Sequence, residues 1–260
     1  MERMLVRAID HNRYELFRVM GEVTGTAVKD HDSFLETRLN PSPWGNYLYR
    51  FQLEEDRLSD EIEVIKQKIQ SGCLPNQILL SSSDRPVGLV NAFVESGFLQ
   101  TLSQTGMILE KGQLRYPADS ASFLTIEMVT KESDLGNWVH CVTDCLFHQG
   151  CVETRAYLPL FRHLFYLKSC VFLLGKIDAL PVSTVFLFQH EAIGGLYFIS
   201  TRPEYQKRGY GAQMIIQALQ TGIINGLMGF ILHATDQGLS LFKRLGFAES
   251  SVIRHLYLNL

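Results

Sequence analysis

The run 206–211, which reads Gln-Lys-Arg-Gly-Tyr-Gly, has the residue types of a phosphate-binding turn. It follows an apolar stretch at 192–200 that predicts a strand. It precedes a helix predicted by apolar residues three and four apart between 212 and 223. The first N–H groups of a helix have no partner within it, and the helix dipole adds positive potential there. Because the two glycines lack a Cβ atom, an anion can approach the backbone closely. The run therefore predicts a site for a diphosphate.

Three phosphate-binding patterns compete for this turn. The Walker pattern needs Gly-Lys followed by Ser or Thr, and the sequence has no such run. The dinucleotide fingerprint G-x-G-x-x-G fails because Met214 occupies its third glycine position. In addition, short links join the strands predicted at 171–174, 182–188 and 192–200, which indicates antiparallel hairpins rather than βαβ units. The third pattern, Gln/Arg-x-x-Gly-x-Gly/Ala after an extended strand, fits.

That third pattern is the signature of the GNAT superfamily of N-acetyltransferases, which residues 203–211 resemble closely. A second match follows a strand predicted at 230–234. Residues 241–247 read Leu-Phe-Lys-Arg-Leu-Gly-Phe, which resembles the Leu-Tyr-x-x-Leu-Gly-Phe helix near the end of many family members. Each motif alone is weak, whereas the two together, in order, are specific. The resemblance covers about residues 122–260.

The resemblance implies an α/β fold of the α+β type. The GNAT fold has a mixed, mostly antiparallel sheet with a splayed central pair of strands, flanked by helices. We assign it to residues 118–260 and expect a smaller α/β domain over residues 1–117. In that first part, helices are predicted at 10–21 and 54–70. The second helix has Leu58, Ile62, Ile65 and Ile69 along one face and Gly72 as its C-cap. The boundary is set at a polar, turn-rich stretch, 111–120.

The resemblance also implies acetyl-CoA as the cofactor and a primary amine of an unknown acceptor as the nucleophile. The amine would attack the thioester directly in a ternary complex, and a backbone N–H near Ile199 or Ser200 would stabilise the oxyanion. The pantetheine arm would pair with the strand before the turn. The implied cofactor-binding residues are Phe198, Ile199, Ser200, Gln206, Lys207, Arg208, Gly209, Tyr210, Gly211, Thr235 and Phe242.

Catalytic groups are harder to assign. An amine that is protonated at neutral pH needs a base. His233, near the end of a strand that should line the slot, is preferred over Glu204. Glu127, His190, Glu191 and Asp236 are further candidates. Phe242 stands where the family often has a tyrosine that protonates the CoA sulfur, so water, Tyr210 or Ser240 would have to substitute. Thr235 stands where many members have an asparagine that holds the pantetheine arm.

These departures keep other functions open. One is a non-catalytic CoA-binding or regulatory module. Another is acyl transfer to a hydroxyl group or with a larger acyl chain. The acceptor could be a small amine, an aminoglycoside, an antibiotic or a protein terminus, and the sequence does not decide among them.

The first half contains a segment similar to the closing motif. Residues 93–98 and 242–247 both have Phe, three residues, then Gly-Phe, and a predicted strand follows each, at 105–109 and at 253–258. We interpret the first half as a degenerate copy of the same fold that has lost its cofactor site; the alternative is a chance likeness. Such a copy would lend strands or a wall to the substrate cleft, with Trp44, Tyr47 and Tyr49 as candidate lining residues.

Composition and charge exclude several classes of function. The chain has 260 residues, 46% of them hydrophobic, and a net charge of -3, which gives no basic field for nucleic acid or an anionic membrane. Without an apolar span or a secretory signal, a cytoplasmic monomer or homodimer is expected. A cluster of cysteines and histidines could indicate a zinc or redox site: His140, Cys141, Cys145, His148 and Cys151. It contains no C-x-x-C pair and its spacing fits no common zinc module, so we expect no metal there. Cys141 and Cys145, one helical turn apart, fit a buried helix face.

Overall fold

The computed structural model describes residues 2–39, 42, 44–116, 124–146 and 150–260. Its helices are α1 (Glu2–Thr24), α2 (Leu58–Gln70), α3 (Leu89–Glu95), α4 (Glu132–Leu146), α5 (Gly150–Phe165), α6 (Tyr210–Ile224) and α7 (Asp236–Arg244), with short 3-10 turns at Glu55–Arg57, Lys111–Gln113 and Pro203–Tyr205. Its strands are β1 (Lys29–Asp30), β2 (Leu35–Thr37), β3 (Tyr47–Tyr49), β4 (Gln77–Ser81), β5 (Leu99–Glu110), β6 (Thr125–Met128), β7 (Cys170–Ile177), β8 (Leu180–His190), β9 (Ile193–Thr201), β10 (Gly229–Ala234) and β11 (Ala248–Tyr257).

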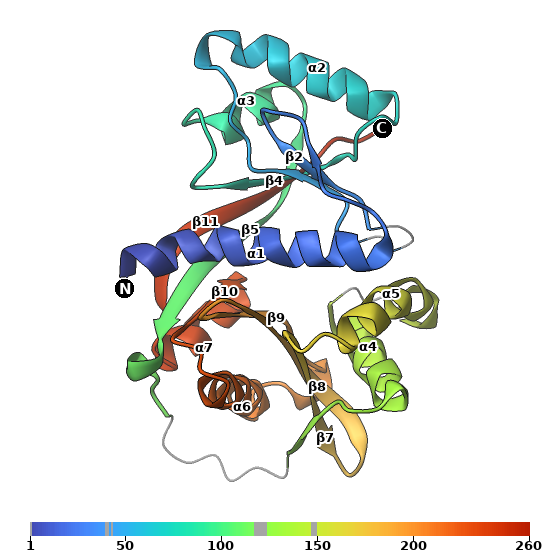
Figure 1. Ribbon diagram of the computed structural model, residues 1–260, viewed down its shortest axis with the longest axis vertical. Coiled ribbons are helices and arrows are strands. Elements are labelled where there is room, and N and C mark those ends of the chain that lie inside the picture. Colours follow the sequence, from blue (N-terminus) through green and yellow to red (C-terminus); the bar gives the residue numbers. More distant parts are fainter. Residues whose placement is uncertain (1, 40–41, 43, 117–123, 147–149) are drawn as a thin grey trace.

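All these strands join one mixed sheet in the order β1-β2-β3-β4-β11-β5-β10-β9-β8-β7-β6. Most neighbours are antiparallel, and the parallel pairs are β3 with β4 and β9 with β10. Strand β5, from the first half of the chain, lies between β10 and β11 of the second half. Figure 1 shows β5 and β11 crossing together from one half of the molecule to the other behind α1.

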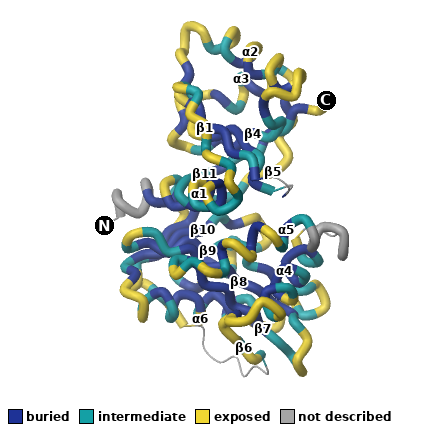
Figure 2. The backbone as a smooth tube through the Cα atoms, turned by 45° about the vertical axis from the view of Figure 1, so that its right-hand side comes forward, coloured by how far each residue is buried: buried dark blue, intermediate teal, exposed yellow. Residues whose placement is uncertain are grey.

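Helices cover both faces of the sheet, as the alternation of side chains along each strand requires. Over the second half, α6 and α7 pack on Leu196, Phe230 and Leu232, whereas α4 and α5 pack on the opposite face. Over the first half, α2 and α3 cover a core that includes Leu48 and Ile78. Figure 2 shows buried positions in β4 of the first half and in β10, β9 and β8 of the second, on either side of α1.

Helix α1 packs against strands of both halves of the chain. Its Ile9 packs on residues of β5, β9 and β10, and its Phe17 packs on Tyr47 and Tyr49 of β3. The sequence predicted a shorter helix at 10–21. The helix is longer than predicted, and from Ala8 to Val23 one of its faces packs on apolar residues of the sheet and of α4 and α5.

The internal copy is visible in the element order, since β3-α2-β4-α3-β5 repeats as β9-α6-β10-α7-β11. The closing turns agree in detail. Phe98 and Phe247 each donate a backbone hydrogen bond to the preceding phenylalanine, Phe93 and Phe242, at 3.1 Å in both cases. The glycines before them, Gly97 and Gly246, have φ values of 98° and 103°. The sequence interpretation of a repeat is therefore confirmed.

The copies are not separate sheets. The closing strand of the first copy, β5, pairs with β10 of the second, and β11 pairs with β4 of the first. The first half thus lends a strand to the second, as the repeat hypothesis anticipated. The strand predicted at 105–109 extends over Leu99–Glu110 because it has a partner on each edge. The expected boundary at 117/118 lies outside the described residues.

Two other sequence expectations hold. Ile62, Ile65 and Ile69 form the buried stripe of α2, and Gly72 adopts the left-handed conformation after it, with φ 75°. Within the described chain, every helix is too short or too polar to cross a bilayer.

The paired glycines of the closing turns allow a matched stability test. Both need a positive φ, so alanine strains either turn by about 1–2 kcal/mol. A Cβ atom on Gly246 would also lie 2.2 Å from the Gln113 carbonyl oxygen, whereas the nearest atom to one on Gly97 is Lys66 Nζ at 3.8 Å. In urea titrations we expect G246A to lose about 1–3 kcal/mol more unfolding free energy than G97A. Equal losses would contradict the close approach of Gln113 to Gly246.

Candidate functional site

Strands β9 and β10 part halfway along their length. Their parallel pairing runs from Ile193 and Gly229 to Leu196 and Leu232 and then stops, although β9 continues to Thr201. The edge of residues 197–201 that faces β10 therefore has no β10 residue paired with it. A strand edge of this kind offers backbone N–H and C=O groups to an extended ligand. The expected splayed pair is present.

A β-bulge lies within the splayed part of β9. Thr184 is opposite Ser200 and Phe186 is opposite Tyr197, so Phe198 and Ile199 together face a single residue of β8. Phe198 has φ 47°, an uncommon conformation for a residue with a bulky side chain. The bulge redirects the backbone groups of the residues for which the sequence implied cofactor contacts.

Two buried hydroxyl groups of β8 hold the bulge in place. Thr184 Oγ1 donates to the Phe198 carbonyl oxygen at 2.9 Å, and Ser183 Oγ donates to the Ser200 carbonyl oxygen at 2.6 Å. Both side chains are fully buried. Sequence reasoning missed them. The signal was present as two adjacent polar residues inside an otherwise apolar strand.

Aromatic packing holds the Phe198 side chain. Its ring lies 5.1 Å from the rings of Trp44 and Phe161 and 6.0 Å from that of Trp138. Trp44 belongs to the first half, so that half reaches the site, as proposed for this residue. Tyr47 instead borders a hollow of about 170 Å³ together with His255, and Tyr49 is buried in the core.

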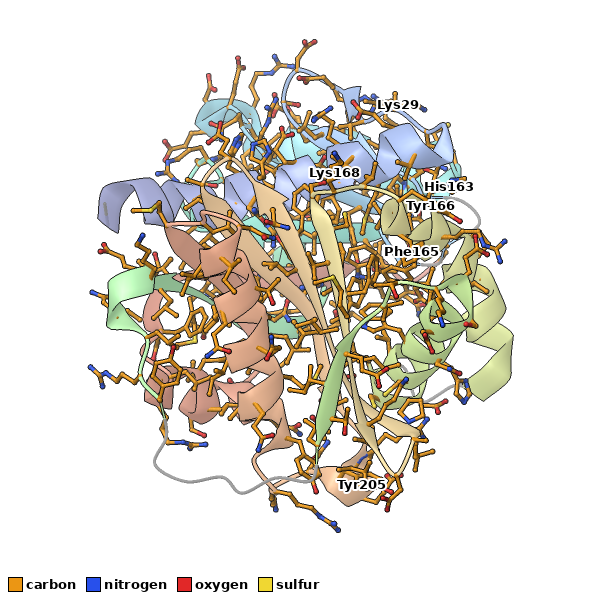
Figure 3. The ribbon with its side chains drawn as sticks, turned by 60° about the horizontal axis from the view of Figure 1, so that its bottom comes forward. Lys29, His163, Phe165, Tyr166, Lys168 and Tyr205 are labelled. Atoms are coloured by element: carbon orange, nitrogen blue, oxygen red, sulfur yellow. The ribbon has the colours of Figure 1, made fainter. Side chains whose placement is uncertain are left out.

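The predicted phosphate turn leads into α6 as expected. Gly209 is its N-cap with φ 82°, and the first N–H with an internal partner is that of Gln213, bonded to the Gly209 carbonyl oxygen at 3.2 Å. Residues 206–209 are exposed. Gln206 Nε2 donates to the Thr201 carbonyl oxygen at 3.0 Å and so ties the turn to the end of β9. The Arg208 guanidinium lies 5.5 Å from the centre of the Tyr205 ring. Tyr205 is labelled at the lower end of the sheet in Figure 3.

Solved structures with the same architecture are known. A GCN5-related N-acetyltransferase from Kribbella flavida superposes with a TM-score of 0.72 at 15% identity, over 97% of this chain and 96% of that one. A GCN5-related N-acetyltransferase from Sphaerobacter thermophilus superposes with a TM-score of 0.64 at 11% identity, over 94% of this chain and 90% of that one. A tandem GNAT protein from the clavulanic acid biosynthesis pathway superposes with a TM-score of 0.56 at 8% identity, over 86% of this chain and 77% of that one. The chain has the GNAT fold. Neither a protein-family model nor a curated protein matches its sequence.

Within this GNAT fold, an ion pair anchors the end of the splayed strand. Arg202 Nη2 lies 3.0 Å from Asp144 Oδ2 of α4, and Arg202 Nε donates to the Pro181 carbonyl oxygen at 2.8 Å. The same contact brings Cys145 of α4 close to Ser200. Three interactions lower the pKa of the Cys145 thiol against the effect of burial. The largest is a hydrogen bond with Cys141, and the others are a hydrogen bond with Ser200 and the charge of Arg202. Sequence reasoning had weighed these cysteines as part of a zinc or redox site and as buried positions on a helix.

Other members of that cysteine and histidine cluster lie elsewhere or are not described. His140 Nε2 lies 3.3 Å from Asp144 Oδ2, one turn further along α4. His148 and the side chain of Cys151 lie outside the described residues.

The catalytic candidates occupy separate places. His233 lies on β10, against which α1 packs. Glu204 is exposed in the turn before residues 206–211, and Ser240 is exposed on α7. Among the described residues, no hydrogen bond or ion pair joins any two of the three. The structure thus places only His233 in an enclosed environment next to the splayed strands.

His233 has an unusual environment. Its Nε2 is buried and has no hydrogen-bond partner within the described chain, and its ring centre lies 6.4 Å from that of Tyr197. Burial, followed by the positive charge of Arg13, holds the pKa of His233 well below its usual range. Both effects favour the neutral form of the His233 ring.

The structure also shows where the two residues that differ from the family motifs lie, Thr235 and Phe242. Thr235 is the N-cap of α7 and is exposed. Phe242 is buried in the core, with its ring 6.0 Å from that of Phe247. Since Phe242 has no hydroxyl group, its position supplies no proton.

The environment of His255, on β11 near His233, predicts that the stability of the protein depends on pH. His255 Nε2 lies 3.0 Å from Gln104 Oε1, and burial, then the charge of Arg13, lowers the pKa of His255 to about 4. Between about pH 6.5 and pH 4 the unfolded chain binds a proton at this residue and the folded chain does not, so acid removes stability. We expect the unfolding free energy to fall by up to about 3 kcal/mol over this window on account of His255.

Urea titrations of wild type and H255Q at pH 7.5 and 4.5 test this expectation. The buried Asp84, whose pKa is raised to about 7 chiefly by burial, acts in the opposite direction. Because Asp84 and His233 are present in both proteins, their effects cancel in the comparison. The pH-dependent loss should be smaller in H255Q, and the same loss in both proteins would show that His255 is protonated normally.

Proposed function

We propose that the protein transfers an acetyl group from acetyl-CoA to a primary amine. The observation that carries the proposal is the exposed N-terminus of α6, which directly follows a strand whose edge has left its neighbour. Free N–H groups at a helix start suit a diphosphate, and a free strand edge suits an extended amide-containing arm. One ligand with both parts in sequence is coenzyme A.

The residues 206–211 would hold the diphosphate through backbone N–H groups, with Lys207 and Arg208 adding charge from exposed positions. Phe198, Ile199 and Ser200 would pair with the arm. The thioester that acetyl-CoA supplies is open to direct attack by an amine. A backbone N–H of Ile199 or Ser200, fixed by the bulge, would stabilise the negative charge on the attacked oxygen, an effect worth a few kcal/mol in enzymes.

The acceptor amine must lose a proton, and we propose His233 as the group that receives it, through water. Its neutral ring and its unpartnered Nε2 support this role. A depressed pKa also makes it a weak base, which limits the rate it can support. Glu204 and Ser240 remain candidates for proton transfer at the mouth of the site, because both are exposed.

A non-catalytic CoA-binding module is the alternative. Two observations favour it: Phe242 is buried and lacks a hydroxyl group, and no interaction between described residues gathers the acid and base candidates at one point. In that case the site would bind the coenzyme without turnover. The fold neighbours named as N-acetyltransferases support the enzyme as the first choice.

Turnover and binding together separate the two functions. Full-length protein would be mixed with acetyl-CoA and a panel of small amines and peptide N-termini, and CoA release would be followed with a thiol reagent. We expect amine-dependent release above the rate of spontaneous hydrolysis. Tight binding of acetyl-CoA with no release across the panel would favour the module.

Gly209 provides a direct test of the coenzyme site. Valine at this position strains a residue with φ 82° and places two methyl groups where the diphosphate would contact the backbone. We expect G209V to weaken CoA binding at least tenfold in calorimetric titrations. Gly226 closes the other end of α6 with φ 89° and open space around it, so G226V carries similar strain without touching the turn. Equal affinities of the two variants for CoA would argue against residues 206–211 as the binding site of its diphosphate.

A further inference from the structure

Three side chains with metal-binding groups meet where α1 crosses the sheet. His11 and Glu15 are one helical turn apart on α1, and His190 is the last residue of β8. One ligand atom from each lies within 4.8 Å of the others. No motif in the sequence pointed to this cluster, because 179 positions separate His11 from His190.

The spacing of the two imidazoles fits a shared cation. Their Nε2 atoms are 3.3 Å apart, and the rings lie edge to face, with centres 5.1 Å apart and planes at 67°. Two nitrogens at about 2.0–2.1 Å from a tetrahedral zinc ion are separated by about 3.3–3.4 Å. The alternative is a single hydrogen bond between the two rings.

The carboxylate that completes the cluster is already oriented. Glu15 Oε2 accepts a hydrogen bond from Arg18 Nε at 2.8 Å, which leaves the second oxygen for another partner. Glu191, on the turn after β8, has Oε1 4.0 Å from His190 Nε2 and is mostly exposed. It stands close enough to offer a fourth ligand, in competition with water. His11 is exposed, so an ion can enter from solvent.

We propose that His11, Glu15 and His190 bind a divalent cation of the zinc class, which fastens α1 to the turn between β8 and β9. Two imidazoles with one carboxylate form a donor set that zinc accepts. The ligands come from both halves of the chain, so the ion would join them.

The site is structural rather than catalytic. His190 lies at the end of β8 that is remote from the phosphate turn. In Figure 3 Lys168, which precedes the strand paired with that end, is labelled beside α1, and Tyr205 is labelled at the opposite end of the sheet. Next to His11, Asn12 contacts both the Ile193 carbonyl oxygen at 3.4 Å and the Tyr197 hydroxyl at 2.8 Å. Fixing α1 would therefore fix Tyr197, which borders the splayed strands.

Metal-free full-length protein would be titrated with zinc chloride by calorimetry and with cobalt(II) by visible absorption, in the absence of CoA. We expect one ion per chain, an absorption spectrum typical of four-coordinate cobalt, and a zinc-dependent rise in Tm. H190N and E15Q should each weaken zinc binding at least tenfold and abolish the rise in Tm, with circular dichroism unchanged.

His140 gives the matched control. It lies one helical turn from the carboxylate of Asp144 on α4, as His11 lies one turn from Glu15, but among the described residues no third metal-binding side chain joins that pair. H140N should bind zinc as wild type does. The absence of a one-to-one zinc complex in wild type, or equal affinities of wild type, H190N and E15Q, would overturn the proposal. Because no step involves CoA or acetyl transfer, these results are independent of the proposed function.

Discussion

The structure depends on the way β10 is hydrogen-bonded. On one edge β10 pairs with β9 over four residues only, and on the other it pairs with β5 along its whole length, from Gly229 to Ala234. Backbone groups in a protein interior need partners, so a strand that leaves one neighbour must be held by another. Strand β5 supplies that support. It allows β9 and β10 to separate at Leu196 without releasing β10 from the sheet.

The support comes from the other copy of the repeat. Each copy ends with the same helix, glycine turn and strand, yet β5 and β11 both run between the halves and pair with each other. The exchange explains why one sheet continues through both copies. It also accounts for the central position of α1, which packs on strands of both halves and covers the line where they join.

Around the splayed strands, the two copies contribute different features. The second copy has the glycine turn, the bulge and the start of α6, where the coenzyme site is proposed. The first half of the chain contributes β5, which pairs with β10, and Trp44, whose ring contacts that of Phe198. The bulge itself is held by hydroxyl groups of β8 and by aromatic rings from α4, α5 and the first half. A strained backbone conformation persists in this way only where its surroundings fix it.

The sequence alone determined the features that depend on neighbouring residues. Local spacing was enough to predict four features: the turn at 206–211, the stripe of α2, the succession of helices and strands along the second half, and the likeness of residues 93–98 to 242–247. Helix periodicity, turn geometry and capping act over a few positions, so they can be read from neighbouring residues. Only the tertiary structure decided which strands pair across the copies, where the bulge falls, and which side chains from distant segments meet. The exchange of β5 and β11, the hydroxyl groups of Ser183 and Thr184 behind Phe198, and the meeting of His11 with His190 arise from contacts between residues far apart in the chain. Such contacts leave no periodic trace in a single sequence, since each residue type is equally compatible with an ordinary surface or core position.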